Sequence, residues 1–149
     1  MSEQKPLGWR EWIGLPGLNI QKIKAKIDTG ARTSALHAFR VEPFQRDSQP
    51  WVRFAIHPVQ GDSSVVVDCE AAVRDQRLVR DSGGHEELRY VIDTEIALGN
   101  DRFRCEVTLT DRDSMMFRVL LGRTALRGKY VIYPGRSYLQ GKPTQGHQE

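Results

Sequence analysis

The chain has 149 residues, which is most simply one domain spanning residues 1–149. Its content of 39% hydrophobic and 28% charged residues excludes an intrinsically disordered protein, and no apolar run reaches the length needed to cross a membrane. The net charge of +3 comes from 22 basic and 19 acidic residues, so it permits an acidic partner without requiring one. Because the N-terminus lacks the apolar core of a signal peptide, we expect a cytoplasmic protein with no membrane partner.

Apolar residues that alternate with polar ones predict β-strands along much of the chain. The alternating segments are Ile23–Ile27, Val52–Ile56, Val65–Val73, Tyr90–Leu98 and Phe103–Leu109. Turn residues at Gly99-Asn100-Asp101 join the last two segments into a hairpin. Near the C-terminus, Thr124–Gly128 predicts one short helix that Gly128 ends, and Tyr130–Tyr133 predicts a further strand.

These elements together predict an all-β fold. About eight short strands would form a closed, barrel-like domain of the retropepsin kind, with one short helix near the C-terminus. The polar residues 141–149, which include Gly and Pro, predict a frayed tail.

Residue types that bind metals are scattered in this sequence. Cys69 and Cys105 fall on the apolar side of alternating segments, which favours buried free thiols over a disulfide. Neither a His-Glu-x-x-His nor a Cys-x-x-Cys pattern occurs, and His37 is more simply a packed residue than a ligand. The sequence also lacks a Gly-rich phosphate loop and a basic stripe with interleaved aromatic residues. We therefore expect no metal, no cofactor and no nucleic-acid partner.

The candidate catalytic element is Asp28-Thr29-Gly30. A strand-like segment delivers the aspartate into a tight turn, in the way that an aspartic peptidase presents its carboxylate. Far downstream, Val119-Leu120-Leu121-Gly122-Arg123 has the two hydrophobic residues and the glycine of the element that passes beneath the catalytic loop in pepsin-type halves. Peptide hydrolysis by this route needs two carboxylates that share one proton. The alternative is that Asp28 only caps a turn, since Asp and Gly are common turn residues.

With both elements in this order, the chain resembles the retropepsin-like peptidases. The string from Lys24 to Ala38 resembles one bacterial branch, which is labelled ATP-dependent zinc protease and is found beside or fused to ATP-grasp glutamate ligases. Retropepsins carry one Asp-Thr-Gly per subunit, so the resemblance implies a homodimer with an Asp28 dyad. It also implies that Thr29 bonds across to the partner loop, and that Gly30 permits the turn and the approach of the substrate. Two alternatives stay open: a metal-dependent peptidase, as the label suggests, and a non-catalytic peptide-binding domain of the same fold.

The same resemblance implies a substrate site around this loop, covered by a mobile flap over residues 75–87. The expected substrate-binding residues are Lys26, Ala31, Arg32, Arg80, Ser82, Gly83 and Arg123. Viral retropepsins have an acidic residue where Arg32 stands, and it pairs with the arginine that matches Arg123. Two arginines there favour a substrate carboxylate. Together with the glutamate ligases that accompany the resembled family, they favour an acidic, glutamate-rich peptide or tail as substrate. The alternatives are that both arginines pair with local acids such as Asp111 or Asp113, and that the flap segment is a solvated hairpin.

Overall fold

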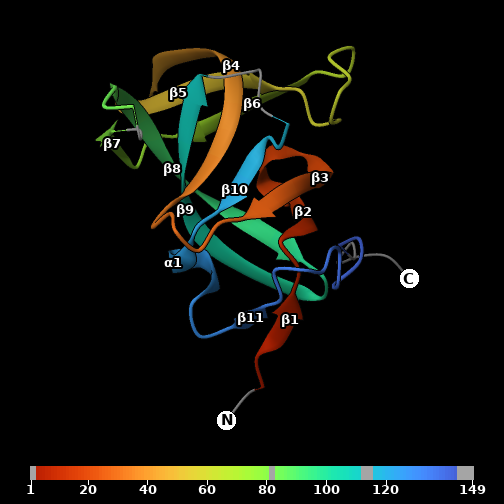
Figure 1. Ribbon diagram of the computed structural model, residues 1–149. Coiled ribbons are helices and arrows are strands. Elements are labelled where there is room, and N and C mark those ends of the chain that lie inside the picture. Colours follow the sequence, from red (N-terminus) through yellow and green to blue (C-terminus); the bar gives the residue numbers. More distant parts are fainter. Residues whose placement is uncertain (1–2, 81–82, 112–115, 144–149) are drawn as a thin grey trace.

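The computed structural model of the chain describes residues 3–80, 83–111 and 116–143. Within these residues lie eleven β-strands, one α-helix and one 3-10 turn, η1 (Pro16–Leu18) (Figure 1). The strands are β1 (Lys5–Leu7), β2 (Arg10–Leu15), β3 (Ile20–Ile27), β4 (Ser34–Arg46), β5 (Gln49–Ile56), β6 (Val67–Ala72), β7 (Asp75–Arg80), β8 (Glu86–Leu98), β9 (Asp101–Asp111), β10 (Val119–Leu121) and β11 (Tyr130–Ile132), and the helix is α1 (Arg123–Leu126). The prediction of an all-β fold with one short helix near the C-terminus is confirmed. No helix in the described part of the chain is long and apolar enough to span a bilayer.

Six of the strands pair in a ring. Their order is β10-β3-β2-β8-β9-β4, and β10 pairs with β4 as well as with β3, so the pairing returns to the strand where it began. The pairs β10–β3 and β4–β9 are parallel, whereas the other pairs of the ring are antiparallel. The core fills the space that the ring encloses, and it includes Ile13, Leu36, Ile92 and Leu121, each with no more than 1% of its surface exposed.

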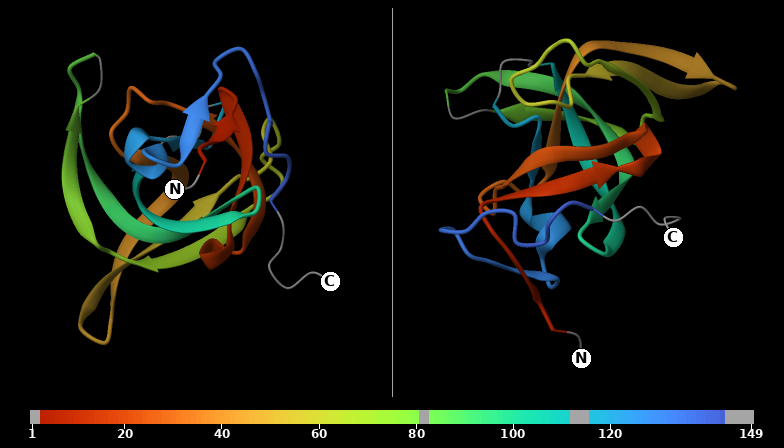
Figure 2. Two further views of the ribbon diagram at one scale, coloured as in Figure 1. Left: turned by 90° about the horizontal axis from the view of Figure 1, so that it is seen from below. Right: turned by 90° about the vertical axis from the view of Figure 1, so that its right-hand side faces the viewer.

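The two strands of thirteen residues, β4 and β8, extend beyond the ring and pair there with β5 and β7. The first residues of β4 pair with β9, and after an irregularity at Arg40, where φ is 53°, the strand continues alongside β5. The strand β8 likewise pairs with β7 over its first half and with β9 over its second half. The β4–β5 and β7–β8 hairpins therefore project from the ring in different directions (Figure 2). The β7–β8 hairpin forms one wall of the candidate site.

The alternating segments correspond to strands β3, β5, β6, β8 and β9. Of the apolar residues that define them, two lie outside the strands: Val65 precedes β6 and is 41% exposed, whereas Val73 follows β6 and is packed against the core. The β8–β9 turn is tighter than predicted, since Leu98 pairs directly with Asp101 and leaves two residues in the loop. The helix starts one residue earlier than predicted and ends at Leu126, before Gly128 with φ of +80°.

The alternation did not indicate the strand β4. Its first five residues, from Ser34 to Ala38, are all buried, because this part of the strand is covered on both faces. A strand that is buried on both faces shows no alternation of polar and apolar residues. Only the tertiary packing therefore identifies this segment as part of the ring.

The buried carboxylate of Glu11 ties the C-terminal segment to β2. Glu11 has 0% of its surface exposed. Its Oε2 accepts hydrogen bonds from the N–H groups of Gly8 (2.6 Å) and Leu139 (2.9 Å), and its Oε1 accepts one from the N–H of Gln140 (3.1 Å). A buried carboxylate is tolerated when its oxygens are hydrogen-bonded in this way. Residues 139–140 are consequently fixed against the start of β2.

Replacing this carboxylate should destabilise the fold. We expect Glu11→Gln to lower the free energy of unfolding by about 2–3 kcal/mol. The carboxylate has two oxygens that accept the three N–H groups, whereas an amide has only one acceptor oxygen. Urea unfolding followed by tryptophan fluorescence measures the change. The exposed Glu42 serves as the matched control, and Glu42→Gln should stay within about 0.5 kcal/mol of the parent protein. Equal stability of the two variants would contradict the anchoring role of Glu11.

Candidate active site

The strand β3 places Asp28 at the start of the loop that leads to β4. Ala25 and Ile27 are buried in the core, which fixes the end of β3 beside β10. The N–H of Asp28 donates to the carbonyl of Leu121 (N···O 2.9 Å), and Oδ1 of Asp28 accepts a hydrogen bond from the N–H of Gly30 (3.1 Å). Asp28 is half-buried, whereas the next two residues are exposed. The Asp-Thr-Gly turn is thus held at its base and open to solvent at its tip.

The residues that follow β10 run along this loop and bond to it. The N–H of Arg123 donates to the carbonyl of Ala31 (2.8 Å), and the N–H of Thr124 donates to the carbonyl of Arg32 (3.1 Å). The hydroxyl of Thr124 donates to the same Arg32 carbonyl (2.9 Å). These bonds join segments about ninety residues apart in the sequence. The backbone of the loop is therefore positioned by a tertiary contact and not only by its own turn.

Gly122 is the point of closest approach between the two segments. Its N–H donates to the buried hydroxyl of Ser34 (3.0 Å). A Cβ atom at this position would lie 2.7 Å from the carbonyl carbon of Thr33, 2.8 Å from its oxygen and 2.9 Å from the carbonyl oxygen of Ala31. Because these neighbours are backbone atoms, they cannot move aside as a flexible side chain could. Only glycine fits between the loop and the end of β10.

The side chain of Arg123 turns toward residues 28–33, the candidate catalytic loop. Its Nη1 donates to the carbonyl oxygens of Thr29 and Gly30, each at 3.2 Å. In viral retropepsins, the matching arginine pairs with an acidic residue where this chain has Arg32. Here the guanidinium binds two backbone carbonyls instead. An arginine therefore still stabilises the loop, although Arg32 replaces the acidic residue.

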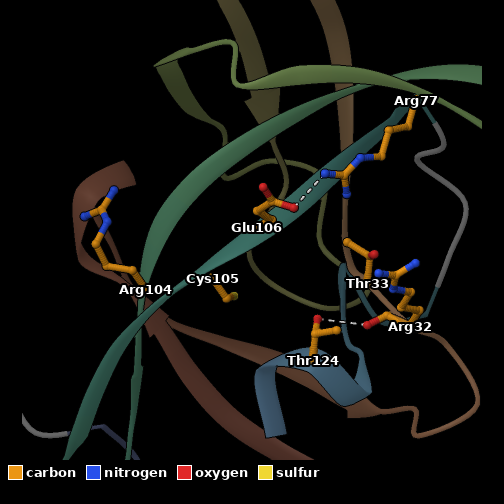
Figure 3. Close-up of a pocket in the computed structure, with 7 residues that line it drawn as sticks. All are labelled: Arg32, Thr33, Arg77, Arg104, Cys105, Glu106 and Thr124. Carbon is orange, nitrogen blue, oxygen red and sulfur yellow. Dashed lines mark hydrogen bonds and ion pairs between the residues drawn. The ribbon is translucent and has the colours of Figure 1, made fainter. Parts of the chain in front are cut away.

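A cavity of about 490 Å³ opens beside this loop. It is lined by Arg32, Thr33, Arg77, Arg104, Cys105, Glu106 and Thr124. Figure 3 shows Arg32 and Arg77 approaching the same space from opposite sides, Arg32 from the catalytic loop and Arg77 from the β7–β8 hairpin, whereas Arg104 points away from both. The candidate site therefore joins the loop, β9, the hairpin and the start of α1.

Three arginines and one glutamate line this cavity. Arg77 is neutralised by Glu106 (2.8 Å) and Asp75 (3.1 Å), and Arg104 pairs with Asp93 (2.8 Å). The hydrogen bond that Arg77 donates to Glu106, followed by the one that it donates to Asp75, raises the pKa of Arg77. Arg32 is exposed, and its guanidinium forms no ion pair with an acid among the described residues. Arg32 is consequently the arginine of this cavity that is available to bind the carboxylate of a ligand.

A family model described as "RimB-like: Retropepsin-like aspartic endopeptidase RimB" matches residues 6–143 of this chain. The chain belongs to this RimB-like family. The match covers the catalytic loop, the hairpin and the segment after β10, and it confirms the resemblance drawn from the sequence motifs.

The curated relatives carry a different name. Proteins named "Probable alpha-L-glutamate ligase" from Shewanella pealeana and Parasynechococcus marenigrum are 43% and 45% identical to this chain, over 95% and 100% of its length. The aligned region is 31% and 32% of those proteins, so this chain spans about a third of the length of the curated relatives it matches. In fold, the chain is similar to a solved Legionella pneumophila protein of unknown function, with a TM-score of 0.76 at 23% identity, over 93% of this chain and 99% of that one.

The residues expected at the substrate site are not all brought together. Ala31 and Arg32 lie in the loop, and Lys26 is exposed on β3 two residues before Asp28. Arg80 pairs with Glu86 (2.7 Å) at the far end of the hairpin, and it does not line the cavity.

Several expectations depend on residues at or beyond the limits of the described chain. Gly83 lies at the exposed tip of the hairpin, whereas Ser82 lies outside the described residues. Asp113 and the side chain of Asp111, the suggested partners of the arginines, also lie outside them. The flap segment does form a hairpin near the loop, and its motion stays a prediction.

The sequence reasoning missed four residues that line the cavity, namely Thr33, Arg104, Glu106 and Thr124. It also considered Arg77 only as part of the flap segment. The register of β7 against β8 and of β8 against β9 brings Arg77 to Glu106, 29 residues away in sequence. No local pattern contains that pairing. Thr124, by contrast, follows the Leu-Leu-Gly-Arg element directly, so its position after this motif was the available signal.

The described residues do not fit a metal centre or a cysteine nucleophile. They contain no group of three or more His, Cys, Asp or Glu side chains placed to hold a metal ion. Both cysteines are free thiols, Cys69 buried and Cys105 half-buried, in line with the expectation for Cys69. Burial raises the pKa of the cavity-lining Cys105 to about 11, so this thiol stays protonated and is a poor nucleophile at neutral pH.

A methyl group at position 122 should disturb the catalytic loop. We expect Gly122→Ala to lower the free energy of unfolding by about 1–3 kcal/mol, because the added Cβ meets the backbone of Ala31 and Thr33. Gly135 is the matched control, since a Cβ there meets nothing within 4 Å. Thermal and urea unfolding compare Gly122→Ala with Gly135→Ala. Similar stabilities for the two variants would show that the loop tolerates the added volume.

Proposed function

We propose that the chain is an aspartic endopeptidase that acts as a homodimer, with Asp28 of each copy contributing one carboxylate. The observation that carries this proposal is the presentation of Asp28, which is held by β10 at its backbone and exposed at the Asp-Thr-Gly turn. The sequence holds one Asp-Thr-Gly, so the second carboxylate comes from a second copy across a twofold axis. Membership of the retropepsin-like family supports the same function.

The chemistry follows from two carboxylates that share one proton. The ionised carboxylate takes a proton from a water molecule as the water oxygen attacks the peptide carbonyl carbon. The neutral carboxyl group gives its proton to the carbonyl oxygen, which forms a tetrahedral diol. When the diol collapses, the C–N bond breaks and the carboxyl group that took the water proton gives it to the leaving nitrogen. The ionised carboxylate takes a proton from a diol hydroxyl, so the dyad again holds one proton. Arg123 holds the loop carbonyls and so keeps the turn in place during these steps.

The substrate is an acidic peptide in this proposal. Arg32 faces the cavity without an acid partner among the described residues, and the lining carries three arginines against one glutamate. The curated relatives are named glutamate ligases, which supports glutamate-rich peptides or tails and a functional link to an ATP-grasp ligase. We place this activity in the cytoplasm, where ATP for such a ligase is available.

Loss of the Asp28 carboxylate should abolish cleavage. We expect Asp28→Asn to reduce kcat/KM on glutamate-rich peptides by about 10⁴-fold or more, with Asp68→Asn as a control that retains activity. Light scattering on the same samples should show a dimer at the concentration where the parent enzyme is active. Retained cleavage by Asp28→Asn would exclude the aspartic mechanism. Activity lost on strong chelation would point instead to a metal-dependent peptidase.

Arg32 should set the preference for acidic substrates. A charge-assisted hydrogen bond from arginine to a carboxylate contributes about 1.5–3 kcal/mol, so Arg32→Ala should lower kcat/KM on acidic peptides roughly 10- to 150-fold. Arg32→Glu should lower it further and leave neutral peptides less affected. The exposed Arg74, which does not line the cavity, provides the control variant Arg74→Glu. Equal rates on matched acidic and neutral peptides, unchanged by Arg32→Glu, would remove support for an acidic substrate.

A further inference from the structure

The outer face of β2 and β3 gathers cations from three parts of the chain. On β3, Lys22, Lys24 and Lys26 alternate with buried residues and so point to the same side. The β2–β3 register places Trp12 opposite Lys24 and Arg10 opposite Lys26. The C-terminal segment runs beside these strands, as the right-hand view of Figure 2 shows. We call this surface the lysine face, and its residues are Arg10, Trp12, Lys22, Lys24, Lys26, Tyr138 and Lys142.

Three ammonium groups of the lysine face gather at one aromatic ring. The Nζ atoms of Lys22, Lys24 and Lys142 lie 5.5, 5.4 and 5.7 Å from the ring centroid of Trp12. Tyr138 stacks on the same tryptophan, with centroids 5.7 Å apart and an interplanar angle of 28°. The aromatic rings thus hold the cations close together, where like charges repel one another.

No acid balances this charge in the described part of the chain. Arg10 donates to the hydroxyl of Ser137 (3.1 Å) and Lys24 donates to the amide oxygen of Gln60 (3.0 Å), and both acceptors are neutral. The described ion pairs all lie elsewhere, on cations such as Arg46, Arg77 and Arg104. Directly opposed like charges, as in the Arg10 and Lys26 pair, destabilise a sheet. The charge of Lys142 also lowers the pKa of Lys22.

We propose that the lysine face is a binding track for an acidic polypeptide segment that extends away from the catalytic loop. Lys22, Lys24 and Lys26 follow one another at intervals of about 7 Å along β3, and the strand ends at Ile27, directly before Asp28. Side chains on one side of an extended peptide have the same spacing, so successive carboxylates can face successive ammonium groups. The track adds a site outside the cavity of Arg32, and its role in cleavage rests on the proposed peptidase function.

An acidic polypeptide fits this face better than a nucleic acid does. Sequence-tolerant nucleic-acid binding uses an open aromatic surface on which bases stack. The ring of Trp12 is half-buried, stacked on Tyr138 and approached by three ammonium groups, so a base would have to displace them. A carboxylate binds the ammonium groups where they already lie.

Binding can be measured without cleavage on the full chain carrying Asp28→Asn. The probes are fluorescein-labelled decaglutamate, decaglutamine and an oligo-uridine of equal charge, and fluorescence anisotropy at low salt gives each Kd. The track variant combines Lys22→Gln, Lys24→Gln and Lys142→Gln. The matched control removes three exposed cations from outside the lysine face, with Arg74→Gln, Arg127→Gln and Lys129→Gln. We expect the track variant to weaken decaglutamate binding about tenfold and the control less than about twofold.

Three results would overturn the track. The first is an equal loss of decaglutamate affinity in the track variant and the control variant. The second is binding of decaglutamine that is as tight as binding of decaglutamate. The third is a loss of affinity confined to oligo-uridine, which would make the face a nucleic-acid site. Cleavage assays with Asp28 restored separate this proposal from the peptidase function. If the parent cleaves peptides while the track variant binds decaglutamate normally, the track fails and the peptidase stands. If the track variant alone loses binding and the parent cleaves nothing, the track stands and the peptidase fails.

Discussion

The backbone contact between residues 28–33 and the segment after β10 is the constraint on which the candidate site depends. All three residues of β10 pair with β3, and two of them, Val119 and Leu120, also pair with β4, so this strand closes the ring. The carbonyl of Leu121 also accepts the N–H of Asp28. Gly122 then passes within contact distance of Thr33, where no side chain fits. One short segment thus fixes both the closure of the sheet and the position of the carboxylate, so neither can shift without the other.

The distribution of charge matters more for this chain than its small net charge. Many arginines are matched by acids across neighbouring strands, as Arg104 is by Asp93 and Arg80 by Glu86. Some cations that form no ion pair in the described residues lie near the Asp28 loop, at Arg32 in the cavity and along β3, whereas others, such as Arg74 and Arg127, lie elsewhere on the surface. Exposed ion pairs contribute little to stability, whereas cations without a partner remain available to an anionic ligand. Under the proposed function, the cations near Asp28 attract acidic peptides toward that loop.

The β7–β8 hairpin has two unlike faces. Toward the cavity, Arg77 pairs with Glu106, and Glu87 accepts a hydrogen bond from the hydroxyl of Thr110, so this face of the hairpin is tied to β9. On the other face, the paired residues Leu78 and Leu88 are 63% and 62% exposed. Polar ties to one neighbouring strand and little apolar burial are typical of a segment that opens at low free-energy cost. A closing motion of the hairpin would have to keep or exchange the Arg77–Glu106 pair.

The sequence by itself determined the class of the fold and the two sequence elements that form the candidate catalytic loop. Alternation identified β3, β5, β6, β8 and β9 because each of these strands has one face toward the core and a more polar face outside. The Asp-Thr-Gly motif and the Leu-Leu-Gly-Arg element carry their own local geometry, so both are recognisable from their residues alone. The buried start of β4 left no such pattern, and it emerged only from the ring.

Tertiary structure alone decided which side chains share a site. Arg32, Arg77 and Glu106 come from three distant segments, and the lysine face joins β2, β3 and the C-terminal residues Tyr138 and Lys142. The residues of the lysine face are spread over more than a hundred positions, from Arg10 to Lys142. The sequence therefore shows no continuous basic stripe with interleaved aromatic residues. Strand register and the anchoring of the C-terminal segment by Glu11 bring them together. Such long-range pairings depend on the packing of the whole chain, which local sequence patterns do not encode.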